Sequence, residues 1–138
     1  MDMRVGFAVI AFACAGAAVS ASAAPAGAVT RQALTVKSMD RTYLQYVPRN
    51  LKPNSPLLFV FHGSGGDGEG MREITGEEFD ALADANSFVV IYPDGFQTTW
   101  NDCRKASQQP ARRANIDDKS FIDAMIERDC ATNSGALR

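Results

Sequence analysis

The residues with the clearest chemical potential are a histidine and a run of glycines at the end of a short apolar segment. His62 is the only histidine of the 138 residues, and Gly63-Ser64-Gly65-Gly66-Asp67-Gly68 follows it directly. Glycine permits positive φ angles and close backbone approach, so consecutive N–H groups of such a loop can point at one acceptor. The loop therefore predicts a cradle for an anion, or for the oxyanion that forms during acyl transfer.

The sequence shows no complete nucleophile and base pair around this loop. His62 stands at the end of a predicted strand, upstream of any nucleophile. His62 is therefore interpreted as an imidazole that is hydrogen-bonded to backbone. Ser64 lacks the glycine two residues earlier that Gly-x-Ser-x-Gly requires, and Ser134 has no strand before it. Neither serine is predicted to be a working nucleophile.

A second interpretation of the glycine run is a dinucleotide-binding βαβ unit. Gly63 to Gly68 formally satisfies G-x-G-x-x-G, and Asp94 ends a later strand where a ribose-binding acid could stand. That fingerprint should run straight into a helix, but the helical spacing begins only near Glu77. Asp94 also follows Pro93 in a turn. This reading is kept as the alternative, beside a non-catalytic secreted binding domain.

Hydrophobic periodicity predicts the elements that position the loop. Alternation predicts a hairpin of residues 33–37 and 43–47, with Leu44 and Tyr46 on one face. The unbroken apolar runs at 57–61 and 88–92 predict strands that are buried on both faces. Spacing of three and four residues predicts helices over 77–86 and up to Arg128, the latter capped by Asn115 or Asp117. Residues 97–114 are expected to form a solvated loop.

This order of elements predicts an α/β fold, in which a mostly parallel sheet follows an N-terminal antiparallel hairpin. Ligands of such sheets bind at the carboxyl ends of the strands. The loops 62–68 and 93–100 leave from that edge, so we expect them to face each other across one cleft. Trp100 could wall an acyl or aromatic pocket there, or serve only in packing. Asp94 could contact substrate or cap its turn.

An ordered set of segments resembles one family, the secreted poly(3-hydroxybutyrate) depolymerases and the feruloyl or acetylxylan esterases among the α/β-hydrolases. The matching segments lie between about residues 35 and 128. They are Arg41-Thr42-Tyr43 with Val47-Pro48, Pro56 to Gly66, Phe88 to Gly95, Trp100-Asn101-Asp102, and Asp117-Asp118 with Phe121-Ile122.

The resemblance implies a carboxylic-ester hydrolase that works by Ser-His-Asp acyl transfer. Gly63, Ser64 and Gly65 would supply the backbone of the oxyanion hole, and His62 would orient the loop. Trp100 and Asp94 would be the candidate substrate contacts. The substrate would be an ester of a polyester or of a plant cell-wall polysaccharide, and no cofactor is implied. Such enzymes continue into a nucleophile elbow, so the chain is expected to be an inactive N-terminal portion, truncated before that elbow.

Composition and the N-terminus place the expected domain outside the cytoplasm. Residues 1–23 combine a basic start, an apolar stretch and Ala21-Ser22-Ala23, which predicts a secretory signal peptide. A linker over 24–32 and an incomplete domain over 33–138 would follow, in a secreted protein of the extracellular space or periplasm. Cys14 also suggests, more faintly, a lipoprotein anchor.

Charge and cysteine count exclude several other classes of function. The net charge of −2 argues against a nucleic-acid partner or an anionic membrane surface. One histidine and no Cys-x-x-Cys leave no zinc motif, so no metal site is predicted. Cys103 and Cys130 could pair in an oxidising compartment.

Overall fold

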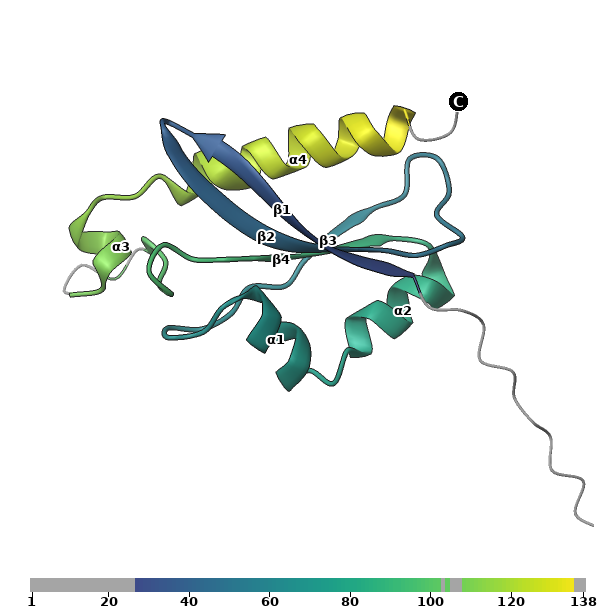
Figure 1. Ribbon diagram of the computed structural model, residues 1–138, viewed down its shortest axis with the longest axis horizontal. Coiled ribbons are helices and arrows are strands. Elements are labelled where there is room, and N and C mark those ends of the chain that lie inside the picture. Colours follow the sequence, from purple (N-terminus) through teal and green to yellow (C-terminus); the bar gives the residue numbers. More distant parts are fainter. Residues whose placement is uncertain (1–26, 103, 105–107, 136–138) are drawn as a thin grey trace, which may run out of the picture.

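A four-stranded mixed sheet with helices on both faces forms the described part of the chain. A computed structural model describes residues 27–102, 104 and 108–135. Its elements in chain order are β1 (Ala28–Val36), β2 (Met39–Val47), β3 (Leu57–Phe59), α1 (Gly68–Ile74), α2 (Glu78–Asn86), β4 (Val89–Pro93), α3 (Pro110–Arg113) and α4 (Asp118–Gly135). Figure 1 shows α1 and α2 on one side of the sheet and α4 on the other. The expected α/β architecture is compatible with this three-layer arrangement.

The predicted hairpin is confirmed, with longer strands and a tighter turn. Every residue of β1 pairs with β2, from Ala28 opposite Val47 to Val36 opposite Met39. The turn is Lys37-Ser38, with φ of 49° and 65°, and such paired left-handed residues suit the twist of a two-residue hairpin. The segment expected as a linker, 24–32, is therefore partly wrong, because β1 already begins at Ala28. Residues 28–32 show little alternation of apolar and polar side chains, so the pattern did not predict a strand there.

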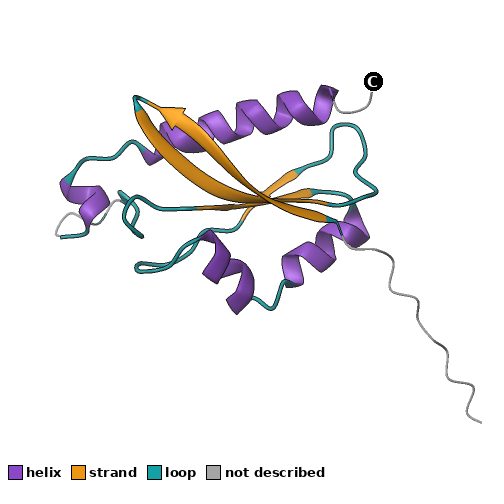
Figure 2. Ribbon diagram, in the orientation of Figure 1, coloured by secondary structure: helices purple, strands orange, loops and turns teal. Residues whose placement is uncertain are grey.

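The sheet runs in the order β1-β2-β4-β3, and it is less parallel than expected. Figure 2 shows its strands between the helices of the two faces. Only β3 and β4 pair in parallel, whereas β2 pairs antiparallel with both β1 and β4. Strand β4 is fully buried, as predicted. Strand β3 is only half-buried and ends at Phe59, and Phe61 is 41% exposed, so the expected burial of 57–61 on both faces is wrong. The physical reason is that β3 is an edge strand of the described sheet.

Two apolar clusters cover the two faces of the sheet. Leu44, Tyr46 and Tyr92 pack under α1 and α2, while Tyr43 and Ile91 pack with the other cluster. The second cluster includes Phe121 and Met125 of α4. The prediction that Leu44 and Tyr46 share one face of β2 is confirmed. This alternation fixes the register of β2 between its neighbours.

The helices differ from expectation mainly at their ends. Helix α2 is confirmed within one residue, but the sequence pattern missed α1, which begins directly at Gly68. The N–H of Ser120 donates to Asp117 Oδ1 at 2.9 Å, which confirms Asp117 as a cap of α4. That helix continues to Gly135 rather than ending at Arg128, and α3 interrupts the expected solvated loop.

Several expectations fall on residues that the structure does not describe. The signal peptide with Cys14, and Cys103 of the possible disulfide, lie outside the described residues. Cys130 is exposed on α4. Across the described ranges, no helix has both the length and the apolar character that crossing a bilayer requires.

Candidate functional site: an oxyanion-type loop at the sheet edge

The glycine loop is anchored by the side chain of His62, which is 5% exposed. The N–H of Gly95 donates to His62 Nε2 at 2.9 Å, and Nδ1 lies 2.6 Å from the carbonyl oxygen of Gly63. Because Nε2 accepts, the proton of the neutral ring is on Nδ1 and is donated to Gly63. The interpretation as a backbone-bonded imidazole is therefore confirmed. Neither ring nitrogen is available to take a proton from a nucleophile in this arrangement.

The loop presents two backbone donors rather than three. Gly63 and Ser64 are exposed, and their N–H groups donate to no acceptor within the described part of the chain. The N–H of Gly65 instead donates to the carbonyl of Thr98 at 2.9 Å, so its expected role as an oxyanion donor is corrected. Gly65 still shapes the loop, since its φ of +85° favours glycine. Backbone N–H groups without a protein acceptor are donors of the kind that can stabilise developing negative charge.

The second loop closes onto the first instead of facing it across an open cleft. Besides the Gly65–Thr98 bond, Trp100 Nε1 donates to the carbonyl of His62 at 3.0 Å. The Trp100 ring lies 5.0 Å from the His62 ring and meets Phe61 edge-on at 5.3 Å. Trp100 thus packs against the back of the loop. The two loops leave the same edge as predicted, but hydrogen bonds join them.

Asp94 holds three elements together at this edge. Its Oδ1 accepts the N–H of Gly68 at 2.8 Å, and its Oδ2 accepts from Thr42 at 2.6 Å and from Arg31 at 2.9 Å. Gly68 is needed here because an added Cβ would meet the carbonyl oxygen of Tyr92 at 2.3 Å. These bonds occupy both oxygens of the Asp94 carboxylate. Asp94 therefore positions the start of α1 relative to β1 and β2.

The start of α1 bears on the alternative of dinucleotide binding in two ways. The glycine loop does run straight into a helix, contrary to the expectation that helical spacing starts near Glu77. However, Asp94 accepts the N–H of Gly68, and Asp67 Oδ1 accepts the N–H of Gly70 at 2.7 Å. Two carboxylates therefore occupy the place of a pyrophosphate and would repel it.

The structure places neither Ser64 nor Ser134 in a nucleophile elbow. Ser64 sits on the exposed loop beside a histidine whose nitrogens are both committed. Ser134 lies within α4, so no strand and sharp turn precede it. Across residues 27–102, 104 and 108–135, no group of three or more His, Cys, Asp or Glu side chains is placed to hold a metal ion.

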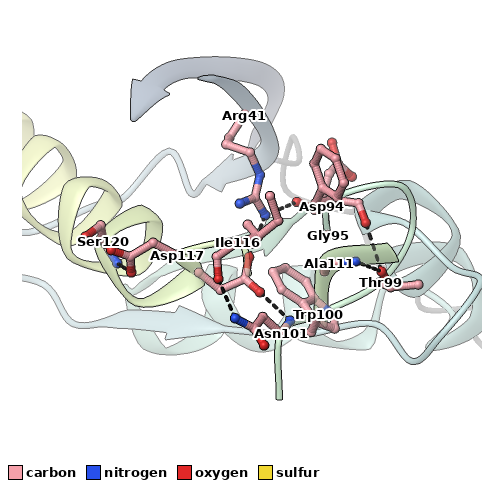
Figure 3. Close-up of polar contacts among 12 residues, drawn as sticks. Arg41, Asp94, Gly95, Thr99, Trp100, Asn101, Ala111, Ile116, Asp117 and Ser120 are labelled. Carbon is pink, nitrogen blue, oxygen red and sulfur yellow. Dashed lines mark hydrogen bonds and ion pairs between the residues drawn. The ribbon is translucent and has the colours of Figure 1, made fainter. Parts of the chain in front are cut away.

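A buried ion pair next to the site was not singled out from the sequence. Arg41 is 5% exposed, and its Nη2 donates to Asp118 Oδ1 at 2.9 Å and to the carbonyl of Asp94 at 3.1 Å. Asp118 Oδ2 accepts the N–H of Asn101 at 2.6 Å. Figure 3 shows Arg41 beside Asp94, with Asn101 and Ile116 close to them. The only signal was that Arg41 and Asp118 both fall in the family-like segments, because a strand residue and the first residue of a helix look ordinary alone.

Comparison with known proteins finds similarities both in sequence and in structure. No protein-family profile matches the chain. A bifunctional acetylxylan esterase/xylanase of Neocallimastix patriciarum is 39% identical over 84 residues, which is 54% of this chain and 12% of that protein. The chain therefore spans about an eighth of that relative's length. Among solved structures, the fluorophosphonate-binding serine hydrolase FphF of Staphylococcus aureus aligns with a TM-score of 0.45 and 12% identity, over 73% of this chain and 42% of that one.

Proposed function

We propose that this chain carries the oxyanion-loop part of a secreted carboxylic-ester hydrolase of the polyhydroxybutyrate depolymerase and feruloyl or acetylxylan esterase type. The observation that carries the proposal is the pair of exposed, unpaired N–H groups of Gly63 and Ser64, held at a strand end by His62. A loop of this kind supplies one side of the oxyanion hole in α/β-hydrolases. The similarity to an acetylxylan esterase supports the same chemistry.

In the proposed reaction the loop binds the carbonyl oxygen of the ester as it gains charge. Gly63 and Ser64 would donate to that oxygen in the tetrahedral intermediate, and loss of one such donor commonly costs about a hundredfold or more in kcat. The Gly95–His62–Gly63 chain of hydrogen bonds would hold these donors in place before substrate arrives. In this proposal none of the described residues acts as the nucleophile, acid or base of the Ser-His-Asp mechanism. The ester would belong to a polyester or to a cell-wall polysaccharide.

The loop can be tested in an active background. The segment of the Neocallimastix patriciarum esterase that matches this chain is replaced by the corresponding segment of this chain, and hydrolysis of an acetylated xylan is measured. Ser64→Ala keeps the backbone N–H and should retain activity, whereas Ser64→Pro removes the N–H and should lower kcat about a hundredfold or more. Equal activity of the two variants in a folded chimera would contradict the proposed donor.

Two further measurements address export and family. Mass spectrometry of the exported protein should show cleavage after Ala23 if residues 1–23 direct secretion. Reading the genomic DNA downstream in all three frames should show a Gly-x-Ser-x-Gly, followed later by Asp and His, if the chain belongs to a triad hydrolase. An intact frame without them would favour the non-catalytic binding domain.

A further inference from the structure

A cavity of about 450 Å³ lies on the α4 side of the sheet, away from the glycine loop. The hairpin turn between β1 and β2 forms one wall, and the corner that leads from α3 into α4 forms the other. Val36, Met39 and Ile116 provide apolar lining, and Lys37 and Arg41 provide charge. No residue of the segment 62–68 lines this cavity. Its volume is in the range that holds small organic ligands.

The arginine that lines the cavity has donors without acceptors. Arg41 is 5% exposed, and its two side-chain hydrogen bonds both come from Nη2, to Asp94 and Asp118. Its guanidinium lies 4.3 Å from the centre of the Phe121 ring, which covers one face of the group. Within the described residues, Nε and Nη1 donate to no acceptor. Buried charged donors are normally satisfied, so a ligand oxygen is the expected missing partner of Nη1.

Two other polar side chains around the cavity, those of Asn101 and Asp117, are already paired. Asn101 Nδ2 donates to the carbonyl of Ile116 at 2.7 Å, and its Oδ1 accepts from Arg112 at 3.2 Å. Asp117 accepts from Lys37 and from Ser120. The Lys37 ammonium holds the pKa of the Asp117 carboxyl well below its usual range. The hydrogen-bonding groups left over are therefore the donors of the Arg41 guanidinium, which favour a ligand with a negatively charged acceptor.

We propose that this cavity binds a small organic carboxylate, whose oxygen accepts from Arg41 Nη1. The ammonium of Lys37, on a side chain that is 68% exposed, stands at the mouth and can turn from Asp117 toward the same carboxylate. The body of the ligand packs against Val36, Met39 and Ile116. This site is separate from the oxyanion loop, so it stands or fails independently of the proposed esterase activity.

Benzoate is a suitable probe, and benzamide is its neutral match in shape. Equilibrium dialysis of the radiolabelled compounds against the 138-residue chain should show saturable binding of benzoate. Benzoate should bind about tenfold or more tightly than benzamide, because a hydrogen bond between charged partners exceeds a neutral one by that factor. Equal binding of the two compounds, or no saturable binding of benzoate, would overturn the proposal.

Paired variants locate the binding in this cavity. Ala114 is exposed at the cavity wall, so Ala114→Trp should fill the cavity and abolish benzoate binding. Ala81→Trp adds the same bulk at an exposed position of α2, on the other face of the sheet, and should bind as the unmodified chain does. Lys37→Met should weaken binding about threefold, whereas Lys119→Met, which breaks an exposed ion pair on α4, should not. Unchanged binding by folded Ala114→Trp would place benzoate elsewhere and overturn the assignment.

Discussion

The N–H of Gly95 donates to His62 Nε2 at 2.9 Å, and this single bond determines what the only histidine of the chain can do. It places the ring proton on Nδ1, which is donated to Gly63, so the imidazole joins two loops through both of its nitrogens. A histidine used in this way holds backbone in place. The unpaired N–H groups of Gly63 and Ser64 are therefore presented by a fixed loop.

Replacement of His62 should loosen this loop and destabilise the fold. His62→Ala leaves the N–H of half-buried Gly95 without its acceptor and removes a ring that packs against Trp100. We expect a loss of about 2–3 kcal/mol in the free energy of unfolding. Urea unfolding followed by fluorescence measures it directly, since Trp100 is the only tryptophan. An unchanged midpoint would show that the ring does not hold the loop.

Two glycines of the loop should respond oppositely to the same substitution. In Gly68→Ala the new Cβ would meet the carbonyl oxygen of Tyr92 at 2.3 Å, so we expect a loss of about 2–3 kcal/mol despite the helix propensity of alanine. In Gly63→Ala the Cβ meets nothing within 4 Å, and stability should change little. Thermal melting of the two variants compares them. Equal melting temperatures would contradict the close approach of α1 to β4.

The 138-residue chain by itself should not hydrolyse esters. His62 is committed to Gly63 and Gly95, and neither Ser64 nor Ser134 stands in a nucleophile elbow. Purified protein should show no saturable hydrolysis of p-nitrophenyl butyrate or methyl ferulate. Hydrolysis that a serine-directed phosphonate abolishes would contradict this, and Ser64→Ala and Ser134→Ala would then identify the nucleophile.

The sequence predicted the central elements well because their signals are local. The buried run of β4 and the alternation along β2 follow directly from the order of residues, and both were found. Helix α1 was missed because it begins with glycines and leaves Ile74 83% exposed, so it has no apolar stripe to detect. Its start depends on Asp67 and on the distant Asp94.

The same limit applies to the candidate site. The glycine loop could be recognised from the sequence, but the loss of the Gly65 donor could not, because its acceptor is the carbonyl of Thr98 in another loop. The Arg41–Asp118 pair likewise joins residues 77 positions apart, and each looks like a surface residue in its own segment. Long-range hydrogen bonds decide which loop groups remain free, and they leave no local pattern.

Stability should depend on pH through a buried carboxyl on α4. Asp129 is 2% exposed, and burial raises the pKa of its carboxyl, although Gln45 donates to it at 2.7 Å. The folded state therefore holds this proton more tightly than the unfolded state does. The protonated Asp129 carboxyl contributes most to the free energy of unfolding below the ordinary pKa of 3.8. This contribution is lost as the pH rises through the raised pKa.

Asp129→Asn should remove the loss of stability that ionisation of this buried carboxyl causes. The amide can still accept from Gln45 and is never charged, so the variant should gain stability over the unmodified chain as the pH rises through this window. Asp123→Asn removes the same charge at an exposed position of α4 and should not show this trend. Guanidinium unfolding at a series of pH values measures the difference. A difference that stays constant with pH would contradict the assignment to Asp129.

The outer edge of β3 should make the 138-residue chain associate. Within the described residues no strand pairs with this edge, and the N–H of Val60 that points inward to Ile91 implies that groups of Phe59 point outward. Half-exposed Leu57, Phe59 and Phe61 flank it, and an open apolar edge templates strand pairing.

Sedimentation velocity should show oligomers that increase with concentration. Phe61→Lys places a charge beside the edge and should reduce them, whereas Ile74→Lys changes a far more exposed apolar residue on α1 and should not. A monodisperse monomer with a cooperative melt, or equal effects of the two lysines, would show that this edge does not drive association.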